Sequence, residues 1–391
     1  LPQFLQSIGA SAAALGFIEG AADALSSFVK LGAGFQSDKT GRRKGWAVLG
    51  YLLTALAKAL FAFAVAWPLI LVGRVIGWLG RGIRGPLRDA MLAESVDSQD
   101  RGKAFGFHRA SDTLGAILGP LAAYGLLAWL GRHPDMLSFF TDLFPFFSDL
   151  PGTSFRVIFL LTLFPGLLSV LTLAILVREK HRTANGDLSF WGALKSLPKN
   201  YRSFLTAVGC FGLADFAPTL MILHASVTLS PLIGPMEAAK LAALLYILRN
   251  VAYAAASFPI GAASTHFSRG GYLAFGYGIA VVTFLGLAFS RPSFAWFAVC
   301  FILSGVFIAW EDTMEAVAVR DYVGDEVAGS AYGVLGVVNG IGDFFSSLMV
   351  GFLWTAMGAF WGFLYAAVVG GIGAWMMFRI SRTPSREAKT P

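Results

Sequence analysis

The stretch Gly34-Phe-Gln-Ser-Asp38-Lys-Thr-Gly41-Arg42-Arg43-Lys44 decides the fold, because it separates two apolar runs of membrane-spanning length. One run ends near Phe35 and the next begins near Trp46. A turn with four cations between two such runs is typical of a cytoplasmic loop, since lysine and arginine accumulate on that side. We expect Asp38 to cap the second helix, Gly41 to form a tight turn, and the arginines to reach carboxylates on adjacent helices.

The composition is that of an integral membrane protein. Of the 391 residues, 56% are hydrophobic and 14% are charged, whereas a soluble domain carries roughly a quarter charged residues. Apolar runs of roughly 20 residues recur, which predicts helices and not a β-barrel. The net charge of +7 is concentrated in 39–44, 178–202 and 379–389, which we place in cytoplasmic loops, so it does not indicate nucleic-acid binding.

Eleven full helices and one preceding fragment are predicted from the apolar runs. The fragment covers 1–8, and the helices cover 11–35, 46–67, 69–92, 104–130, 155–177, 204–229, 238–265, 272–289, 294–320, 331–355 and 360–378. Residues 131–154 are predicted to be an acidic outer loop. The basic linker 178–202 separates an N-terminal bundle, 1–177, from a C-terminal bundle, 203–380, which is followed by a cytoplasmic tail, 381–391.

An internal repeat relates the two halves. Gly34 matches Gly261, and Gly102-Lys-Ala-Phe-Gly106 matches Gly329-Ser-Ala-Tyr-Gly333, both at an offset of 227 residues (261 − 34 = 333 − 106 = 227). The repeat predicts two parallel six-helix halves. Because the second half starts near Tyr201, its counterpart would start about 26 residues before Leu1. We therefore expect most of the first transmembrane helix to be absent from this sequence.

The pattern G-x-x-x-D-K-x-G-R-R-K resembles the signature loop between helices 2 and 3 of the major facilitator superfamily, and the repeat extends this resemblance over nearly the whole chain. The resemblance implies an all-α membrane fold of two six-helix bundles related by pseudo-two-fold symmetry. It also implies that the loop is a charge latch at the cytoplasmic gate. At the offset of 227 residues, Asp38, Gly41 and Arg43 align with Thr265, Ser268 and Gly270, so the latch belongs to the first half. The expected gate residues are Gly34, Asp38, Gly41, Arg42, Arg43, Arg88, Asp89 and Asp112.

The segment Gly115-x-x-x-Gly119-Pro120 resembles the helix-5 motif of proton-driven exporters in this superfamily, although Leu121-Ala122-Ala123 stands where small residues usually follow. A Gly-Pro pair bends a helix and lets it approach a partner closely. The motif favours export, and ordinary tight packing is the alternative explanation.

Charged side chains at membrane depth are the candidate transport residues, because each costs several kcal/mol unless it faces protein or water. Arg81, Arg84 and Arg88 share one helix face, and the offset of 227 aligns Arg84 and Arg88 with Glu311 and Glu315. The expected substrate or proton-coupling residues are Glu19, Asp23, Arg81, Arg84, Asp215, Arg249, Glu311, Glu315 and Asp343. Desolvation favours the protonated form of a carboxylate, so we expect Glu19, Asp23, Asp215, Glu311 and Asp343 to include the proton carrier. Structural ion pairing is the alternative role for these carboxylates.

The predicted function is secondary active transport by alternating access, driven by a proton gradient without a cofactor or metal. The sequence lacks a G-x-x-x-x-G-K-[ST] loop, a zinc-spaced cluster and a G-x-S-x-G elbow, which argues against an ATP-driven pump and an enzyme. Export of a small organic solute is the first expectation. The alternatives are proton-coupled uptake of an organic acid or metal chelate, with Arg81, Arg84 and Arg249 binding the anion, and a non-transporting receptor or lipid-handling scaffold.

The expected location and partners follow from the same patterns. We expect a monomer that crosses the plasma (inner) membrane many times, with its C-terminus in the cytoplasm. Its partners would be a small-molecule substrate, protons and the lipid bilayer. Cations and carboxylates both occur among the candidate residues, so the sequence leaves the charge of the substrate open.

Overall fold

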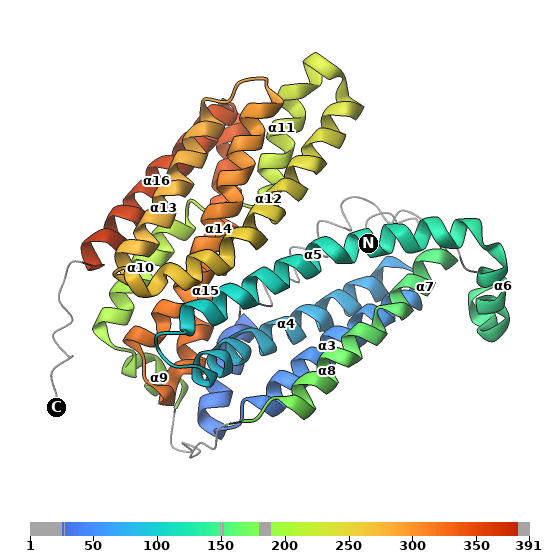
Figure 1. The fold of residues 1–391 in the computed structure, drawn as a ribbon, viewed down its shortest axis with the longest axis horizontal. Coiled ribbons are helices and arrows are strands. Elements are labelled where there is room, and N and C mark those ends of the chain that lie inside the picture. The colour runs from blue at the N-terminus through green and yellow to red at the C-terminus, as the bar shows by residue number, and fades with distance from the viewer. Residues whose placement is uncertain (1–25, 27, 149, 151, 180–188, 382–391) are drawn as a thin grey trace. The chain divides into compact units, whose positions relative to one another are not determined.

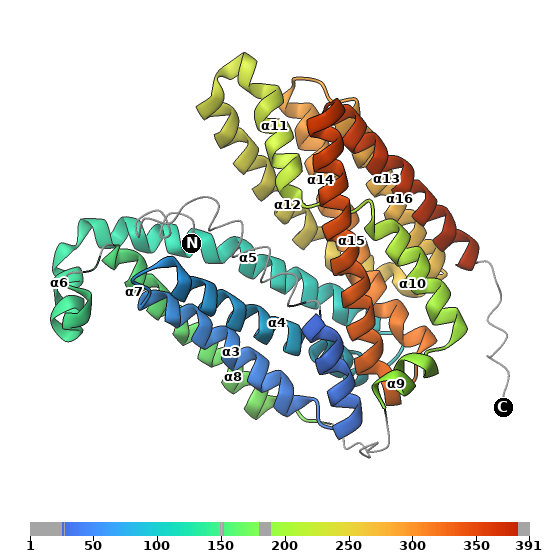
Figure 2. The same cartoon turned by 180° about the vertical axis from the view of Figure 1, so that it is seen from behind.

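The fold was analysed in a computed structural model, which describes residues 26, 28–148, 150, 152–179 and 189–381 (Figures 1 and 2). Every regular element within these ranges is a helix. Two compact units are present. Unit 1 contains Leu1–Met91, Leu118–Leu194 and Tyr332–Gly336, and unit 2 contains Leu92–Ile117, Lys195–Ala331 and Val337–Pro391.

Unit 1 is built around α3 and the helices that pack on it. Its elements are a helix over 28–40, α3 (Lys44–Ala62), α4 (Trp67–Ser95, up to Met91), the second part of α5 (Arg101–Arg132), α6 (Pro134–Leu143), η1 (Pro145–Phe147), α7 (Thr153–Leu161), α8 (Leu163–Leu176) and α9 (Phe190–Ser196, up to Leu194). Helix α3 packs against α7 and α8. Small residues allow α3 and α4 to touch, since a Cβ on Gly50 would lie 2.7 Å from the carbonyl oxygen of Gly80.

Unit 2 contains the start of α5 and most of the later helices. These are α10 (Lys199–Gly212), α11 (Pro218–Ile233), α12 (Pro235–Ala263), η2 (Ser264–His266), α13 (Arg269–Ala288), α14 (Phe294–Tyr322), η3 (Asp325–Val327), α15 (Ala328–Met357) and α16 (Ala359–Ser381). Helix α14 packs on α12 and α13, and α16 packs on α10 and α13. The rings of Phe211 and Tyr277 stack in the core, with their centroids 3.7 Å apart.

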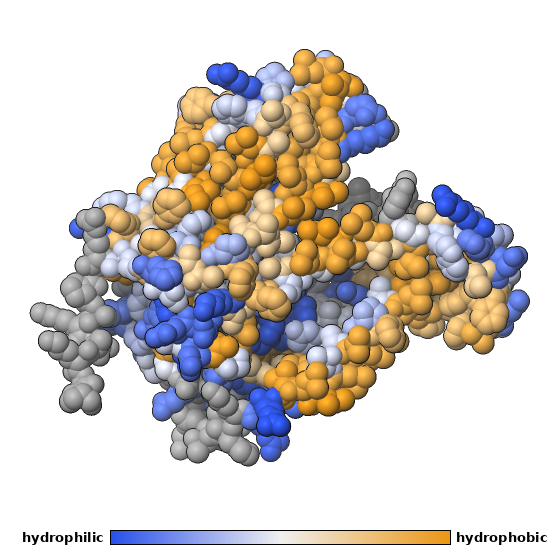
Figure 3. Space-filling view, in the orientation of Figure 1, coloured by the Kyte–Doolittle hydropathy of each residue, from blue (hydrophilic) through white to orange (hydrophobic). Residues whose placement is uncertain are grey.

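Many of these helices can cross a membrane. Within the described ranges, eight helical segments are long and apolar enough to do so by length and composition. Hydrophobic side chains cover much of the surface over the helices in Figure 3. Large apolar residues exposed along such helices are suited to contact lipid, which accounts for their position outside the cores of the two units.

One helix crossing occurs in both units and matches the sequence repeat. In unit 2 the backbone of Gly106 lies against that of Ser257, and in unit 1 Gly333 lies against Lys30. The residues of the two contacts correspond at the predicted offset (333 − 106 = 257 − 30 = 227). A Cβ at either glycine would overlap the facing backbone, so only glycine permits these approaches. Residues related by the sequence repeat therefore form equivalent helix contacts in the two units.

The predicted helix over 204–229 is wrong, because the structure has two helices separated by a break. Helix α10 ends at Gly212, and α11 begins at Pro218. Proline has no N–H and forces the residue before it to be extended, as Ala217 is with ψ 134°. The hydroxyl of Ser347 accepts a hydrogen bond from the Ala217 N–H at 2.9 Å. Asp215 thus lies in a break and not in the middle of a helix.

Other predicted boundaries also differ from the structure: the helix predicted to end at residue 35 continues to Thr40, and the helix predicted over 46–67 ends at Ala62. Three further segments are divided or contain a helix that was not predicted. The run 155–177 is divided at Thr162, because the ring of Pro165 is incompatible with the carbonyl four residues earlier. The predicted outer loop 131–154 contains helix α6, in which Pro134 occupies the first turn. The basic linker 178–202 contains α9, and α10 begins there at Lys199.

Some predictions fall outside the described residues. These are the fragment 1–8, the first part of the helix predicted over 11–35 with Glu19 and Asp23, the tail beyond residue 381, and the expected absence of most of the first helix. The linker-based division into bundles stays a prediction. Contacts group the start of α5, up to Ile117, with unit 2.

Candidate functional site

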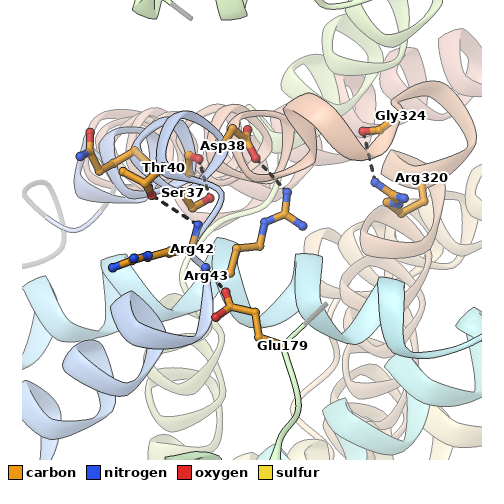
Figure 4. Close-up of polar contacts among 10 residues, drawn as sticks. Ser37, Asp38, Thr40, Arg42, Arg43, Glu179, Arg320 and Gly324 are labelled. Atoms are coloured by element: carbon orange, nitrogen blue, oxygen red, sulfur yellow. Dashed lines mark hydrogen bonds and ion pairs between the residues drawn. The ribbon is translucent and has the colours of Figure 1, made fainter. Parts of the chain in front are cut away.

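The signature loop of unit 1 is held by a buried ion pair (Figure 4). The helix over 28–40 ends at Thr40, and Gly41 reverses the chain with φ +66°. Arg43 then donates from Nη2 to Oδ1 of Asp38 at 2.8 Å, and the two side chains are 1% and 0% exposed. The predicted turn at Gly41 is present. Asp38 binds Arg43 and is not the N-cap of α3, because it still lies within the preceding helix.

A charged side chain binds each end of α3, and each charge has the sign that stabilises that end of a helix. The carboxylate of Glu179 accepts hydrogen bonds from the backbone N–H groups of Arg43 and, at 2.9 Å, of Lys44. At the other end, Nη1 of the fully buried Arg156 donates to the carbonyl of Ala62 at 2.6 Å. A helix N-terminus favours an anion and a C-terminus a cation. Neither residue was predicted from the sequence, because their partners lie 94 or more residues away.

Replacing Arg156 with glutamine should destabilise unit 1. The variant removes a charged donor and leaves a buried carbonyl at the end of α3 poorly satisfied, at a cost of about 2 kcal/mol. Unfolding in a detergent titration, followed by circular dichroism, measures the change. Arg132→Gln is the matched control, since Arg132 is exposed and should change stability by less than about 0.5 kcal/mol. Equal stability of the two variants would contradict the capping role.

Four cations gather on α3 and α4 of unit 1. The guanidinium of Arg84 lies 4.5 Å from the ring centroid of Tyr51, while those of Arg81 and Arg74 lie 4.8 and 5.8 Å from that of Trp78. Lys58 is close enough to Arg84 and Arg74 for their charges to interact.

Only two of these cations were expected. Arg81 and Arg84 were predicted from the sequence, but Lys58 and Arg74 were not, although intramembrane charge marks both as candidates. Cations this close repel one another, so an anion among them would be stabilised. Further along α4, the predicted gate residues Arg88 and Asp89 bind each other at 3.0 Å.

Unit 2 carries carboxylates on α14, and their surroundings differ. Glu315 accepts hydrogen bonds from the hydroxyl of Tyr277 at 2.5 Å and from the amide of Asn339 at 2.7 Å. Glu311 is also buried, but its Oε2 has no hydrogen-bond partner among the described residues. Glu315 is thus fixed by two donors, whereas one oxygen of Glu311 is left unsatisfied.

The other predicted residues of unit 2 surround Glu311. Its charge interacts with those of Asp215, Asp312, Glu315 and Asp343. The structure therefore brings together Asp215, Arg249, Glu311, Glu315 and Asp343.

Arg249 is the cation in this group. Its Nε donates to the hydroxyl of Ser304 at 2.9 Å, and its charge interacts with Asp215 and Asp312. The hydroxyl of Tyr253 binds Asp312. Tyr253, Tyr277 and Ser304 were not predicted as site residues, because hydroxyl groups in apolar helices give no signal as distinct as a charge.

The group in unit 2 is chemically suited to exchange protons. An ionised carboxylate without a partner is costly in low-dielectric surroundings, and proton uptake removes that cost. Carboxylates whose charges interact do not titrate independently, so a proton gained by one changes the affinity of the others. A cation such as Arg249 can compensate one negative charge at a time.

The helix-5 motif makes no close approach in this structure. A Cβ on Gly115 or Gly119 would meet no described atom within 4 Å. Asp112, predicted for the gate, is exposed. The gate and export roles of these residues remain predictions.

Comparisons with known proteins identify relatives along the whole chain. The family model described as Major Facilitator Superfamily matches residues 1–247 and 233–391. An uncharacterized MFS-type transporter of Methanocaldococcus jannaschii is 29% identical over 382 residues, which cover 97% of this chain and 89% of the relative.

Two further relatives match about a third of the chain. A probable 4-methylmuconolactone transporter of Cupriavidus pinatubonensis is 33% identical over 133 residues, covering 34% of this chain and 31% of the relative. The quinolone resistance protein NorA of Staphylococcus aureus is 28% identical over 120 residues, covering 31% of each.

Among solved structures, the fucose:proton symporter FucP of E. coli has a TM-score of 0.71 at 19% identity, covering 97% of this chain and 92% of FucP. At this identity the likeness extends to the fold alone.

Proposed function

The chain belongs to the major facilitator superfamily, and on this premise we propose that it is a proton-coupled transporter that exports a small organic solute by alternating access. It is a multi-pass membrane protein of a transporter family. The observation that carries the proton coupling is the buried Glu311, whose Oε2 lacks a hydrogen-bond partner within the described chain while four other carboxylates interact with it. The proton gradient is the only energy source in this proposal, without a cofactor.

The carboxylates have different roles in this proposal. Glu311 carries the proton, because its gain of a proton removes an unsatisfied buried charge. Tyr277 and Asn339 hold Glu315 in place, so Glu315 transmits the change in charge without leaving its donors. Arg249 pairs with whichever neighbouring carboxylate is ionised, among which Asp215 and Asp312 are near enough to interact. Loss of such an ion pair would shift the equilibrium between the two conformations of the alternating-access cycle.

Export and uptake are each favoured by different features of the chain and its relatives. The short match to a quinolone resistance protein and the helix-5 motif favour export. A matching relative named as a probable 4-methylmuconolactone transporter, and a fold shared with a fucose:proton symporter, are compatible with uptake. Export remains our first choice because two separate features favour it.

Proteoliposomes with an imposed pH gradient test this function. Purified protein is reconstituted with a pH-sensitive dye inside, and lipophilic organic cations and organic anions are added in turn. Proton flux that depends on the solute supports a coupled transporter, and opposite directions of proton and solute movement identify an exchanger. Binding of a solute without flux would instead favour a receptor or scaffold.

Uptake of an organic anion is the second candidate, and the four cations of α3 and α4 favour it. Replacing Lys58 with methionine should raise the KM for a transported anion about tenfold, since a charge-assisted contact contributes roughly 1.5–3 kcal/mol. Lys240→Met is the control, because Lys240 is exposed and pairs with Glu237 one turn earlier in its helix. An unchanged KM in Lys58→Met would remove the anion from this part of unit 1.

A further inference from the structure

An apolar groove lies on unit 2 between α13, α14 and α16. Its volume is about 660 Å³, and its walls include Phe275, Gly278, Val282, Leu303, Trp375 and Phe378. Small residues on α13 and α16 create the groove, since a Cβ on Gly278 would meet no atom within 4 Å. All the lining residues are apolar, so the groove has no groups with which to bind a polar solute.

The groove opens onto an exposed apolar surface. Phe275 and Trp375, on opposite walls, are 62% and 57% exposed. Both α13 and α16 are long and apolar enough to span the membrane. Lining residues on α13 run from Gly271 to Val282, a length of about 16 Å at 1.5 Å per residue. A depression of this length in a hydrocarbon environment fits a lipid acyl chain.

A cation lies at one end of the groove. The guanidinium of Arg379 sits over the ring of Trp375, 4.9 Å from its centroid. Arg379 is in the last turn of α16, which meets the start of α13, because a Cβ on Gly270 would lie 2.8 Å from that of Ser381. An exposed arginine beside an apolar groove is complementary to a phospholipid, whose phosphate can bind the arginine while its acyl chain lies in the groove.

We propose that this groove is a binding site for one membrane phospholipid, with an acyl chain along α13 between Phe275 and Trp375 and the phosphate at Arg379. The acyl chain fills the groove and contacts the apolar walls that no side chain of the described residues covers. The phosphate accepts charge-assisted hydrogen bonds from the guanidinium, whose position over Trp375 orients it. The site is separate from the carboxylates of unit 2 and does not depend on the direction of transport.

Native mass spectrometry of the delipidated full chain with palmitoyl-oleoyl phosphatidylglycerol tests this site. Gly278→Phe should fill the groove and lower the occupancy of the tightest lipid about tenfold. Gly371→Phe on α16 is the matched control, because Gly371 is equally half-buried, has open space around its Cβ and lies outside the groove. The control should retain the lipid.

A second variant tests the phosphate. Wild-type protein should prefer phosphatidylglycerol over a diacylglycerol with the same acyl chains, and Arg379→Gln should reduce this preference about tenfold. Phosphatidylglycerol with a photoreactive acyl chain should label 271–282 or 374–378. Equal lipid occupancy in Gly278→Phe and Gly371→Phe, labelling elsewhere, or displacement of the label by a transported solute but not by phospholipid would each overturn the proposal.

Discussion

Glu311→Gln is expected to abolish transport driven by a pH gradient while leaving the protein folded. Glutamine has nearly the same shape but cannot take up or release a proton. Losing a positioned proton-transfer group costs about a hundredfold or more in rate. The initial rate of solute movement into or out of proteoliposomes under an imposed pH gradient is the measurement. Glu237→Gln, in an exposed pair with Lys240, is the control and should transport at the wild-type rate.

Exchange of labelled for unlabelled solute, without any gradient, separates coupling from binding. If Glu311 carries the proton, the glutamine variant should still exchange solute, because exchange needs binding and conformational change but no net proton movement. Loss of both activities would instead make Glu311 a substrate or structural residue. Normal gradient-driven transport in the variant would contradict the proposal and direct attention to Asp215 or Asp343.

Asp38→Asn should be the most destabilising change in the signature loop. The variant leaves the guanidinium of Arg43 buried opposite a neutral amide, and breaking a buried pair in this way costs about 3 kcal/mol or more. The free energy of unfolding in a detergent titration measures it. Arg42→Gln is the control, because Arg42 is exposed and its change should stay within about 0.5 kcal/mol.

The double variant Asp38→Asn, Arg43→Gln shows whether the two side chains act together. If they do, the loss of stability in the double variant should be smaller than the sum of the two single losses, by about 1 kcal/mol or more. Additive losses would mean that each side chain is held mainly by other neighbours. A transport assay on the same variants tests whether the loop acts as a gate latch. If the loop only supports the fold, the transport rate should fall in proportion to the amount of folded protein.

Much of the fold could be predicted from local pattern and spacing. The apolar runs determined where membrane helices occur, and Gly41 marked a turn that needs a positive φ. The offset of 227 residues predicted two halves, and the structure adds that glycines related by this offset lie at equivalent helix crossings, because glycine lets two backbones approach so closely. Five residues of unit 2 that were selected for their intramembrane charge lie together, as expected if such charges must face protein or water, and their roles in transport stay predictions.

The break at Pro218 was foreseeable in part. Pro218 is visible in the sequence, but only the structure shows that the chain leaves the helix at Leu213 and that the hydroxyl of Ser347 accepts a hydrogen bond from the N–H of Ala217. A proline in an apolar run can either bend a helix or end it. The choice depends on whether a neighbouring helix supplies a partner for the freed backbone.

The sequence by itself determined the membrane class, the repeat and the elements that carry charge. Only the tertiary structure decided which charge meets which partner. Glu179 reaches the start of α3, Arg156 reaches its end, and Tyr277 rather than a cation holds Glu315. These contacts join residues that are 38 to 135 positions apart. The spacing of residues along the sequence indicates which face of a helix a side chain occupies. Its partner depends on the packing of helices that are far apart in the sequence.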